Sequence, residues 1–207
     1  MRKAICIASL FLLAGCAAPD SGEALKSTFD SGVAAYDAGD YPRAYKIWSG
    51  IDDIDLAAMR NVAMMLRQGQ GVAKDPKKAE DLYETAAEAG LPTAQADLAD
   101  MLLKGEAGPP NPKRALPLLT AAAAANHPLA QYELAQMYET GADGLVPKDM
   151  NVARQLYTSA AGHGMKEAQD RLDQLAKTEG PIRLMQPAPT TPGQTAASEG
   201  NLRPAQP

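Results

Sequence analysis

Three stretches of this 207-residue chain are variants of one another: AMRNVAMMLRQG at residues 58–69, AQADLADMLLKG at 94–105 and AQYELAQMYETG at 130–141. They recur every 36 residues, and each keeps alanine at its first and sixth positions, methionine at its eighth and glycine at its last. Apolar residues follow one another at spacings of three and four, which is typical of one face of an α-helix. Self-similarity at such a period indicates a repeat architecture, in which each unit packs on the next.

A second helical segment follows each of these stretches. Two of the three begin with a capping side chain before a proline at the first helical position, Asp75-Pro76 and Asn111-Pro112. The segments end at residues that tolerate the left-handed backbone found after helices, namely Gly90, Asn126 and Gly164. The third unit carries two extra residues before its second segment, as a loop insertion would, and a fourth unit starts at Ala168 with a single helix. The pattern predicts an all-α, right-handed solenoid of helix–turn–helix repeats.

The second segment of the middle unit contains a proline, Pro117, in its interior. Proline lacks the backbone N–H of a helical hydrogen bond, and its ring clashes with the carbonyl four residues earlier, that of Lys113. We therefore expect this helix to be kinked or to start late.

The loop of the first unit carries a family pattern. The order alanine, methionine, glycine and then Gly-x-Gly-Val before an aspartate, at residues 58–75, resembles the Sel-like repeat (SLR), a relative of the tetratricopeptide repeat. The loops at 105–111 and 141–149 depart from this pattern. Upstream, Gly32, Tyr36, Gly39-Asp40-Tyr41, Ala44 and Trp48 are more similar to a plain tetratricopeptide unit. The resemblance implies a tetratricopeptide-like repeat at 23–56 and a Sel-like repeat array at 57–177.

The chain is acidic and poor in residues that bind metals. Its formal net charge is −5 and its pI is near 5.1, whereas nucleic-acid binding needs a clustered basic surface. Two cysteines, Cys6 and Cys16, and two histidines, His127 and His163, share no metal-ligand spacing. We therefore expect no nucleic-acid partner, no catalytic residues, no metal, no cofactor and no enzymatic activity.

The N-terminus has the layout of a bacterial export signal. Arg2 and Lys3 precede an apolar run from residue 4 to 14, which is too short to span a membrane. The run closes at Leu13-Ala14-Gly15-Cys16, which resembles a lipobox, the motif whose cysteine is acylated and becomes the mature N-terminus. We expect a signal peptide at 1–15 and a lipidated tether at 16–22, the alternative being an ordinary signal peptide with a chance cysteine. Ala17, rather than aspartate, after the cysteine implies the outer membrane, and we expect the protein to face the periplasm.

The C-terminal segment differs in composition from the repeats. Residues 180–207 contain six prolines and few large apolar side chains. Such a segment buries too little surface to offset the entropy of ordering, so we predict a disordered, proline-rich tail at 178–207.

The predicted solenoid favours a role in protein binding. Met65, Met101 and Met137 are expected in the core, with adaptable partner contacts as the alternative. Candidate partner-binding residues, offset from the core on the first helices and expected to be exposed, are Arg60, Arg67, Gln95, Lys104, Gln131 and Tyr138.

The resemblance implies a non-catalytic cell-envelope scaffold or adaptor for an unidentified envelope protein. The alternative is a lipoprotein that binds glycan or peptidoglycan or assists polysaccharide export. An enzyme is disfavoured because the cysteine-rich relatives linked to cell-wall chemistry have cysteines in their repeats, which this chain lacks.

Overall fold

The computed structural model describes residues 21–179, and within that range the chain forms α-helices, one 3₁₀ turn and no strand. The predicted signal peptide, Cys16 and the tail from residue 180 lie outside the described residues. The first helix begins at Ser21, so the last two residues of the expected tether, Ser21 and Gly22, are helical. The last helix likewise continues through Thr178.

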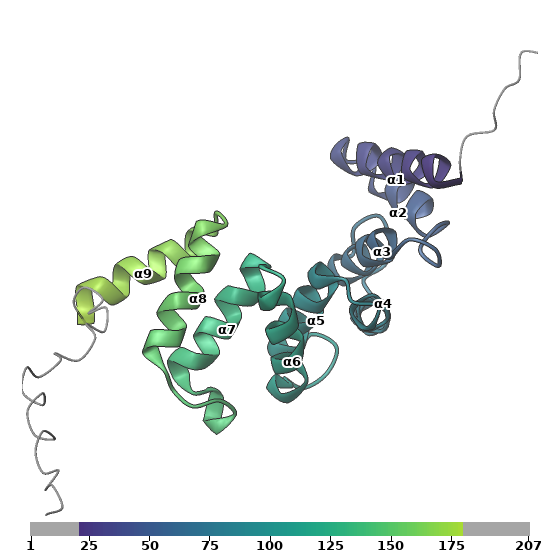
Figure 1. Ribbon diagram of the computed structural model, residues 1–207. Coiled ribbons are helices and arrows are strands. Elements are labelled where there is room, and N and C mark those ends of the chain that lie inside the picture. The colour runs from purple at the N-terminus through teal and green to yellow at the C-terminus, as the bar shows by residue number, and fades with distance from the viewer. Residues whose placement is uncertain (1–20, 180–207) are drawn as a thin grey trace, which may run out of the picture.

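The helices form successive hairpins along an extended array, with α1 and α9 at opposite ends (Figure 1). The pairs α3–α4, α5–α6 and α7–α8 are the three predicted repeats, α1–α2 is the upstream hairpin, and α9 packs on α8. This architecture confirms the all-α repeat solenoid. The helices are α1 (Ser21–Asp37), α2 (Tyr41–Trp48), α3 (Leu56–Gln68), α4 (Pro76–Glu88), α5 (Pro92–Lys104), α6 (Pro112–Ala124), α7 (Pro128–Thr140), α8 (Met150–Gly162) and α9 (Lys166–Glu179).

Local sequence signals set the ends of these helices. The side chains of Asp75 and Asn111 accept hydrogen bonds from the backbone N–H groups of Lys78 and Arg114, which cap α4 and α6 as predicted. Beyond α4, α6 and α8 the chain turns through left-handed residues at the predicted Gly90, Asn126 and Gly164. The extra residues of the third repeat lie in the α7–α8 loop, which contains the 3₁₀ turn Ala142–Gly144.

The core is built from small and flexible side chains. The alanines at the sixth position of each stretch are fully buried, which lets the two helices of a hairpin approach closely. The three aligned methionines are also buried, so their predicted place in the core is confirmed. These residues are Ala63, Ala99 and Ala135, and Met65, Met101 and Met137.

Pro117 does not delay its helix. α6 begins at Pro112 and runs through Pro117 to Ala124, so the expected late start is wrong. The proline faces solvent, while Ala115 and Leu119 on the opposite side are fully buried. Because one missing backbone hydrogen bond costs less than releasing that buried face, the helix continues through the proline.

The upstream hairpin packs closely against the first repeat. A Cβ atom added to Gly71 in the α3–α4 loop would lie 2.3 Å from the backbone carbon of Tyr41, at the start of α2. The Tyr36 hydroxyl donates a hydrogen bond to Gln70 Oε1 at 2.8 Å. These contacts join the upstream hairpin α1–α2 to the first repeat. None of the helices between Ser21 and Glu179 is long and apolar enough to cross a bilayer.

Candidate interaction cleft

The candidate residues lie on α3, α5 and α7, the first helices of the three repeats, and two of the arginines are already paired. Arg60 donates to Asp97 on α5, with its Nε 2.6 Å from Oδ2. Arg67 is held by two carboxylates of the second repeat, whereas Lys104 is largely exposed. The arginines therefore join adjacent repeats within the array.

The two candidate glutamines occupy equivalent positions and serve the turns before their helices. Gln95 and Gln131 each donate a side-chain hydrogen bond to a backbone carbonyl at the end of the preceding helix, at 3.2 Å to Ala87 and 3.3 Å to Ala123. Gln131 is only 3% exposed, so the expectation that it is exposed is wrong. Its side-chain amide is buried because it donates a hydrogen bond to the backbone carbonyl of Ala123. Tyr138 is half-buried and packs against both core clusters.

One repeat position connects each first helix to the first helix of the next repeat. This tenth position of the stretch is occupied by Arg67, Leu103 and Glu139. At two junctions it meets the fourth position of the next repeat: Leu103 lines a cleft together with Glu133, and Glu139 bonds Arg171, allowing for the two-residue insertion. At the first junction Arg67 reaches Asp100 and Glu106 instead. The three junctions therefore differ in charge although their backbones repeat.

The junction between α3 and α5 is an ionic cluster around Arg67. Arg67 Nη2 lies 2.5 Å from Asp100 Oδ2 and 2.5 Å from Glu106 Oε1, and Lys104 Nζ lies 2.7 Å from Asp100 Oδ1. The hydrogen bonds to Glu106 and Asp100 raise the pKa of Arg67 despite its burial. Burial alone would raise the pKa of Asp100, but hydrogen bonds from Lys104, Arg67 and Glu133 together lower it. Both carboxylates of this junction are thus ionised and paired.

The junction between α7 and α9 is paired with the opposite polarity. Arg171 on α9 holds Glu139 with two hydrogen bonds, one of them 3.1 Å from Nε to Oε2. The Tyr157 hydroxyl on α8 donates to the same carboxylate oxygen at 2.7 Å. The hydrogen bond from Arg171 lowers the pKa of Glu139, while burial raises that of Tyr157.

The junction between α5 and α7 lacks such a pair. Its tenth-position residue is Leu103, which cannot neutralise Glu133. Glu133 is 7% exposed, and its Oε2 has no hydrogen-bond partner among residues 21–179. Burial, together with a hydrogen bond to the carboxylate of Asp100 and the negative charge of Asp100, raises the pKa of Glu133 to about 9. This carboxyl is therefore held neutral at pH 7.

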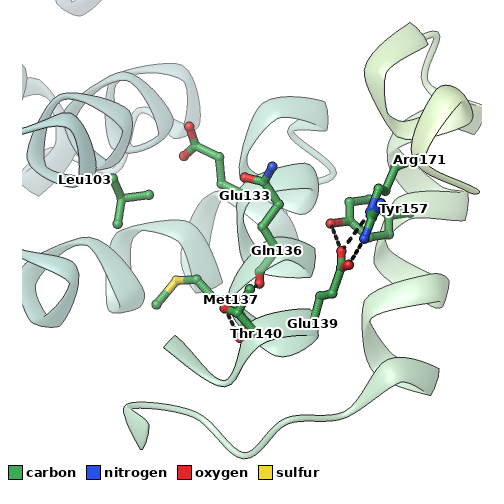
Figure 2. A pocket seen from close by; sticks show the side chains of 8 residues that line it. All are labelled: Leu103, Glu133, Gln136, Met137, Glu139, Thr140, Tyr157 and Arg171. Atoms are coloured by element: carbon green, nitrogen blue, oxygen red, sulfur yellow. Dashed lines mark hydrogen bonds and ion pairs between the residues drawn. The ribbon is translucent and has the colours of Figure 1, made fainter. Parts of the chain in front are cut away.

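Glu133 lines a cleft of about 480 Å³. Leu103 and Met137 form one apolar side of it, and the bonded group of Glu139, Tyr157 and Arg171 forms the other (Figure 2). Gln136 and Thr140 complete the lining. The cleft combines an apolar wall, a satisfied ion pair and one buried carboxyl that is not paired with a cation, an arrangement that suits binding of a side chain.

Residue patterns singled out Arg60 and Arg67 as candidates for partner binding, but not the acidic side chains that pair with them within the array. The ionisable residues that line the cleft or form the junctions, beyond those predicted, are Asp97, Asp100, Glu106, Glu133, Glu139, Tyr157 and Arg171. Aligning the repeats and comparing charges at the fourth and tenth positions would have found several of them. Across residues 21–179, no group of three or more histidine, cysteine or acidic side chains is placed to hold a metal ion.

Comparison with known proteins identifies the repeats. The Sel1 repeat matches residues 56–91, 92–127 and 128–165, which coincide with the three hairpins α3–α4, α5–α6 and α7–α8. A search of curated protein sequences finds no significant match.

Several solved structures share the architecture. A Sel1 repeat protein from Oxalobacter formigenes is 32% identical with a TM-score of 0.66, and the match covers 72% of this chain and 60% of that one. A protective antigen of uropathogenic Escherichia coli strains with an SLR fold is 28% identical with a TM-score of 0.69, covering 76% of this chain and 34% of that one. An immunity protein from Pseudomonas aeruginosa, 24% identical with a TM-score of 0.54 over 75% of this chain and 59% of that one, shares the fold.

The chain therefore spans less than two thirds of the length of these structures. Sel1 repeat proteins generally act as scaffolds for protein interactions and are typically non-catalytic. Since the repeat matches cover more than half of the residues, this chain belongs to the Sel1 repeat family.

Proposed function

We propose that the protein is a non-catalytic scaffold of the bacterial cell envelope that binds another protein through the cleft on its first helices. The observation that carries this proposal is the cleft itself. It lies on a Sel1 repeat array and is lined by an apolar wall and by a buried carboxyl that is not paired with a cation. Stacked helical repeats provide extended surfaces suited to peptides and proteins.

The envelope location is supported by the first sixteen residues. The charged start, short apolar run and Leu13-Ala14-Gly15-Cys16 are the layout of a lipoprotein signal. Acylation at Cys16 would anchor the repeats to the outer membrane on the periplasmic side, since several acyl chains together hold a protein stably at a bilayer.

The test is in vivo crosslinking followed by affinity capture of the lipidated protein, with mass spectrometry of what is recovered. Capture of one dominant envelope protein, lost on Leu103→Glu in the cleft and retained on Lys177→Glu on the exposed side of α9, supports a scaffold. Recovery of peptidoglycan or glycan fragments with no protein enriched would replace the proposal with a carbohydrate-binding lipoprotein.

The anchor has a separate test. Cys16→Ala should give a soluble or unprocessed species on membrane fractionation. Continued fractionation of that variant with the outer membrane would contradict lipidation at Cys16 without affecting the scaffold proposal.

A further inference from the structure

Glu133 is a buried acidic residue in the lining of the cleft, and no cation is paired with it among residues 21–179. Its side chain is 7% exposed, and within the described part of the chain Oε2 accepts no hydrogen bond. A buried polar atom without a hydrogen-bond partner destabilises the folded state. A ligand that donates a hydrogen bond to this oxygen would remove that cost, so the unpaired atom marks a favourable place for a donor to bind.

The cations around Glu133 are committed to other carboxylates. Lys104 on α5 lies 2.7 Å from Asp100, and Arg67 on α3 is shared between Asp100 and Glu106. On the far side of the cleft, Arg171 is bonded to Glu139. A cation for Glu133 must therefore come from outside these residues.

The shape of the cleft suits a long basic side chain. Leu103 and Met137 line it beside Glu133, as Figure 2 shows. Lysine and arginine bury their aliphatic stems against such apolar surface and place the charged group at its polar end. The net charge of −5 also favours the approach of a basic partner.

We propose that this cleft is a subsite for a lysine or arginine side chain of a peptide segment in a partner protein, whose cationic group pairs with Glu133. This inference rests on the proposed scaffold function and names the chemistry of its partner. The incoming cation would complete at the α5–α7 junction the pairing that Arg67 and Arg171 provide at the other two.

Binding of a cation is coupled to a proton. Glu133 holds a proton in the free protein, so pairing with a cation releases that proton to solvent. The charged and titratable groups around it are Asp100 and Lys104 on α5, Arg67 on α3, Glu139 on α7, Tyr157 on α8 and Arg171 on α9. All of these groups have partners of their own, and Asp100 also accepts a hydrogen bond from the protonated Glu133, so Glu133 is the group that changes ionisation.

The experiment is a titration of the full-length chain with Ac-Ala-Leu-Arg-Leu-Ala-NH₂ and with the same peptide carrying citrulline, which has the shape of arginine without its charge. We expect the arginine peptide to bind at least about tenfold more tightly in calorimetry and NMR titration. Calorimetry at pH 7.5 in two buffers of different ionisation enthalpy should show release of about one proton per peptide bound.

Matched variants locate the effect. Glu133→Gln should remove both the preference for arginine and the proton release. Asp97→Asn, at the equivalent position of the preceding repeat and outside the cleft, should retain both. Leu103→Arg, which supplies an internal cation, should weaken binding of the arginine peptide.

Equal affinities for the two peptides, no binding of either, or equal binding by the wild type and a folded Glu133→Gln variant would overturn the subsite. The affinity capture separates this failure from failure of the scaffold. A protein partner recovered equally by wild type and Glu133→Gln leaves the scaffold intact and rejects the basic anchor, whereas no partner at all rejects the scaffold.

Discussion

The junctions on either side of α5 are built from the same repeated stretch, but one is closed by ion pairs and the other contains a neutral carboxyl that is not paired with a cation. Between α3 and α5, Arg67 joins two carboxylates and leaves a fully paired cluster. Between α5 and α7, Leu103 stands in its place and Glu133 is left neutral beside an open cleft. The repeat backbone thus fixes where the junction is, while one side chain decides whether it is closed by ion pairs or available to a ligand.

The largest test of this comparison removes the cation from the closed junction. Arg67→Leu should destabilise the protein by about 3 kcal/mol, because it leaves the buried Asp100 and its neighbour Glu106 without their shared partner. Urea unfolding followed by circular dichroism measures the change.

Lys104→Met is the control for Arg67→Leu. Lys104 contacts the same Asp100 from a side chain that is 60% exposed, so its loss should cost about 0.5 kcal/mol or less. Equal losses for the two variants would mean that burial does not set the strength of this junction.

A second test addresses the open junction through pH. The folded protein holds the Glu133 proton up to about pH 9, whereas the unfolded chain loses it near 4.5. Unfolding therefore releases a proton between these values, so the free energy of unfolding falls as the pH rises from about 5 to about 9 and then levels off with respect to this group.

Glu133→Gln keeps the shape of the side chain and removes its charge. The variant should lose that part of the pH dependence. It should be more stable than wild type by at least about 2 kcal/mol at pH 9, with little difference at pH 5. Unfolding curves across this range provide the measurement, and parallel curves for both proteins would show that Glu133 ionises normally.

A third test converts the open junction into the closed one. Leu103→Arg places a guanidinium at the position from which Arg67 reaches the second repeat. The pKa of Glu133 should fall well below 9, and stability at pH 8 should rise by about 1 kcal/mol. Carbon-13 NMR titration of the Glu133 carboxyl follows the pKa directly. If it stays near 9, a guanidinium at position 103 does not reach Glu133.

The two kinds of feature differ in how far sequence predicts them. Helices, loops and caps such as Asp75 and Asn111 follow from local signals, and the buried methionines follow from periodicity. The burial of Gln131 does not follow from local signals, because it depends on a hydrogen bond to the backbone carbonyl of Ala123 near the end of the preceding helix. The start of α6 at Pro112 does not follow from Pro117 either, since the buried side of the helix outweighs the local cost of the proline.

The cleft was harder to predict because it is defined by a missing partner. Glu133 looks like any acidic residue on a helix until the side chain opposite it is known. Which residues face each other across 30 to 40 positions depends on how the hairpins stack. The repeat length predicts which helices meet. The side chain at the tenth position of each stretch, Arg67, Leu103 or Glu139, then distinguishes one junction from the next.

The smallest expected effect on stability concerns the contact between α4 and α6, the second helices of the first two repeats. Arg114 on α6 bridges Glu80 and Glu84 on α4 at 2.7 and 2.8 Å, but its side chain is 42% exposed. Water and salt screen such pairs, so Arg114→Ala should cost about 0.5 kcal/mol, and the loss should shrink further in 1 M salt, where the screening length is about 3 Å. Arg67→Leu should keep most of its larger loss in the same salt, because that cluster is buried. Thermal unfolding of both variants at low and high salt compares the two layers directly. If the stability lost in Arg114→Ala does not depend on salt, the α4–α6 ion pairs contribute to holding adjacent repeats together and are not merely screened surface contacts.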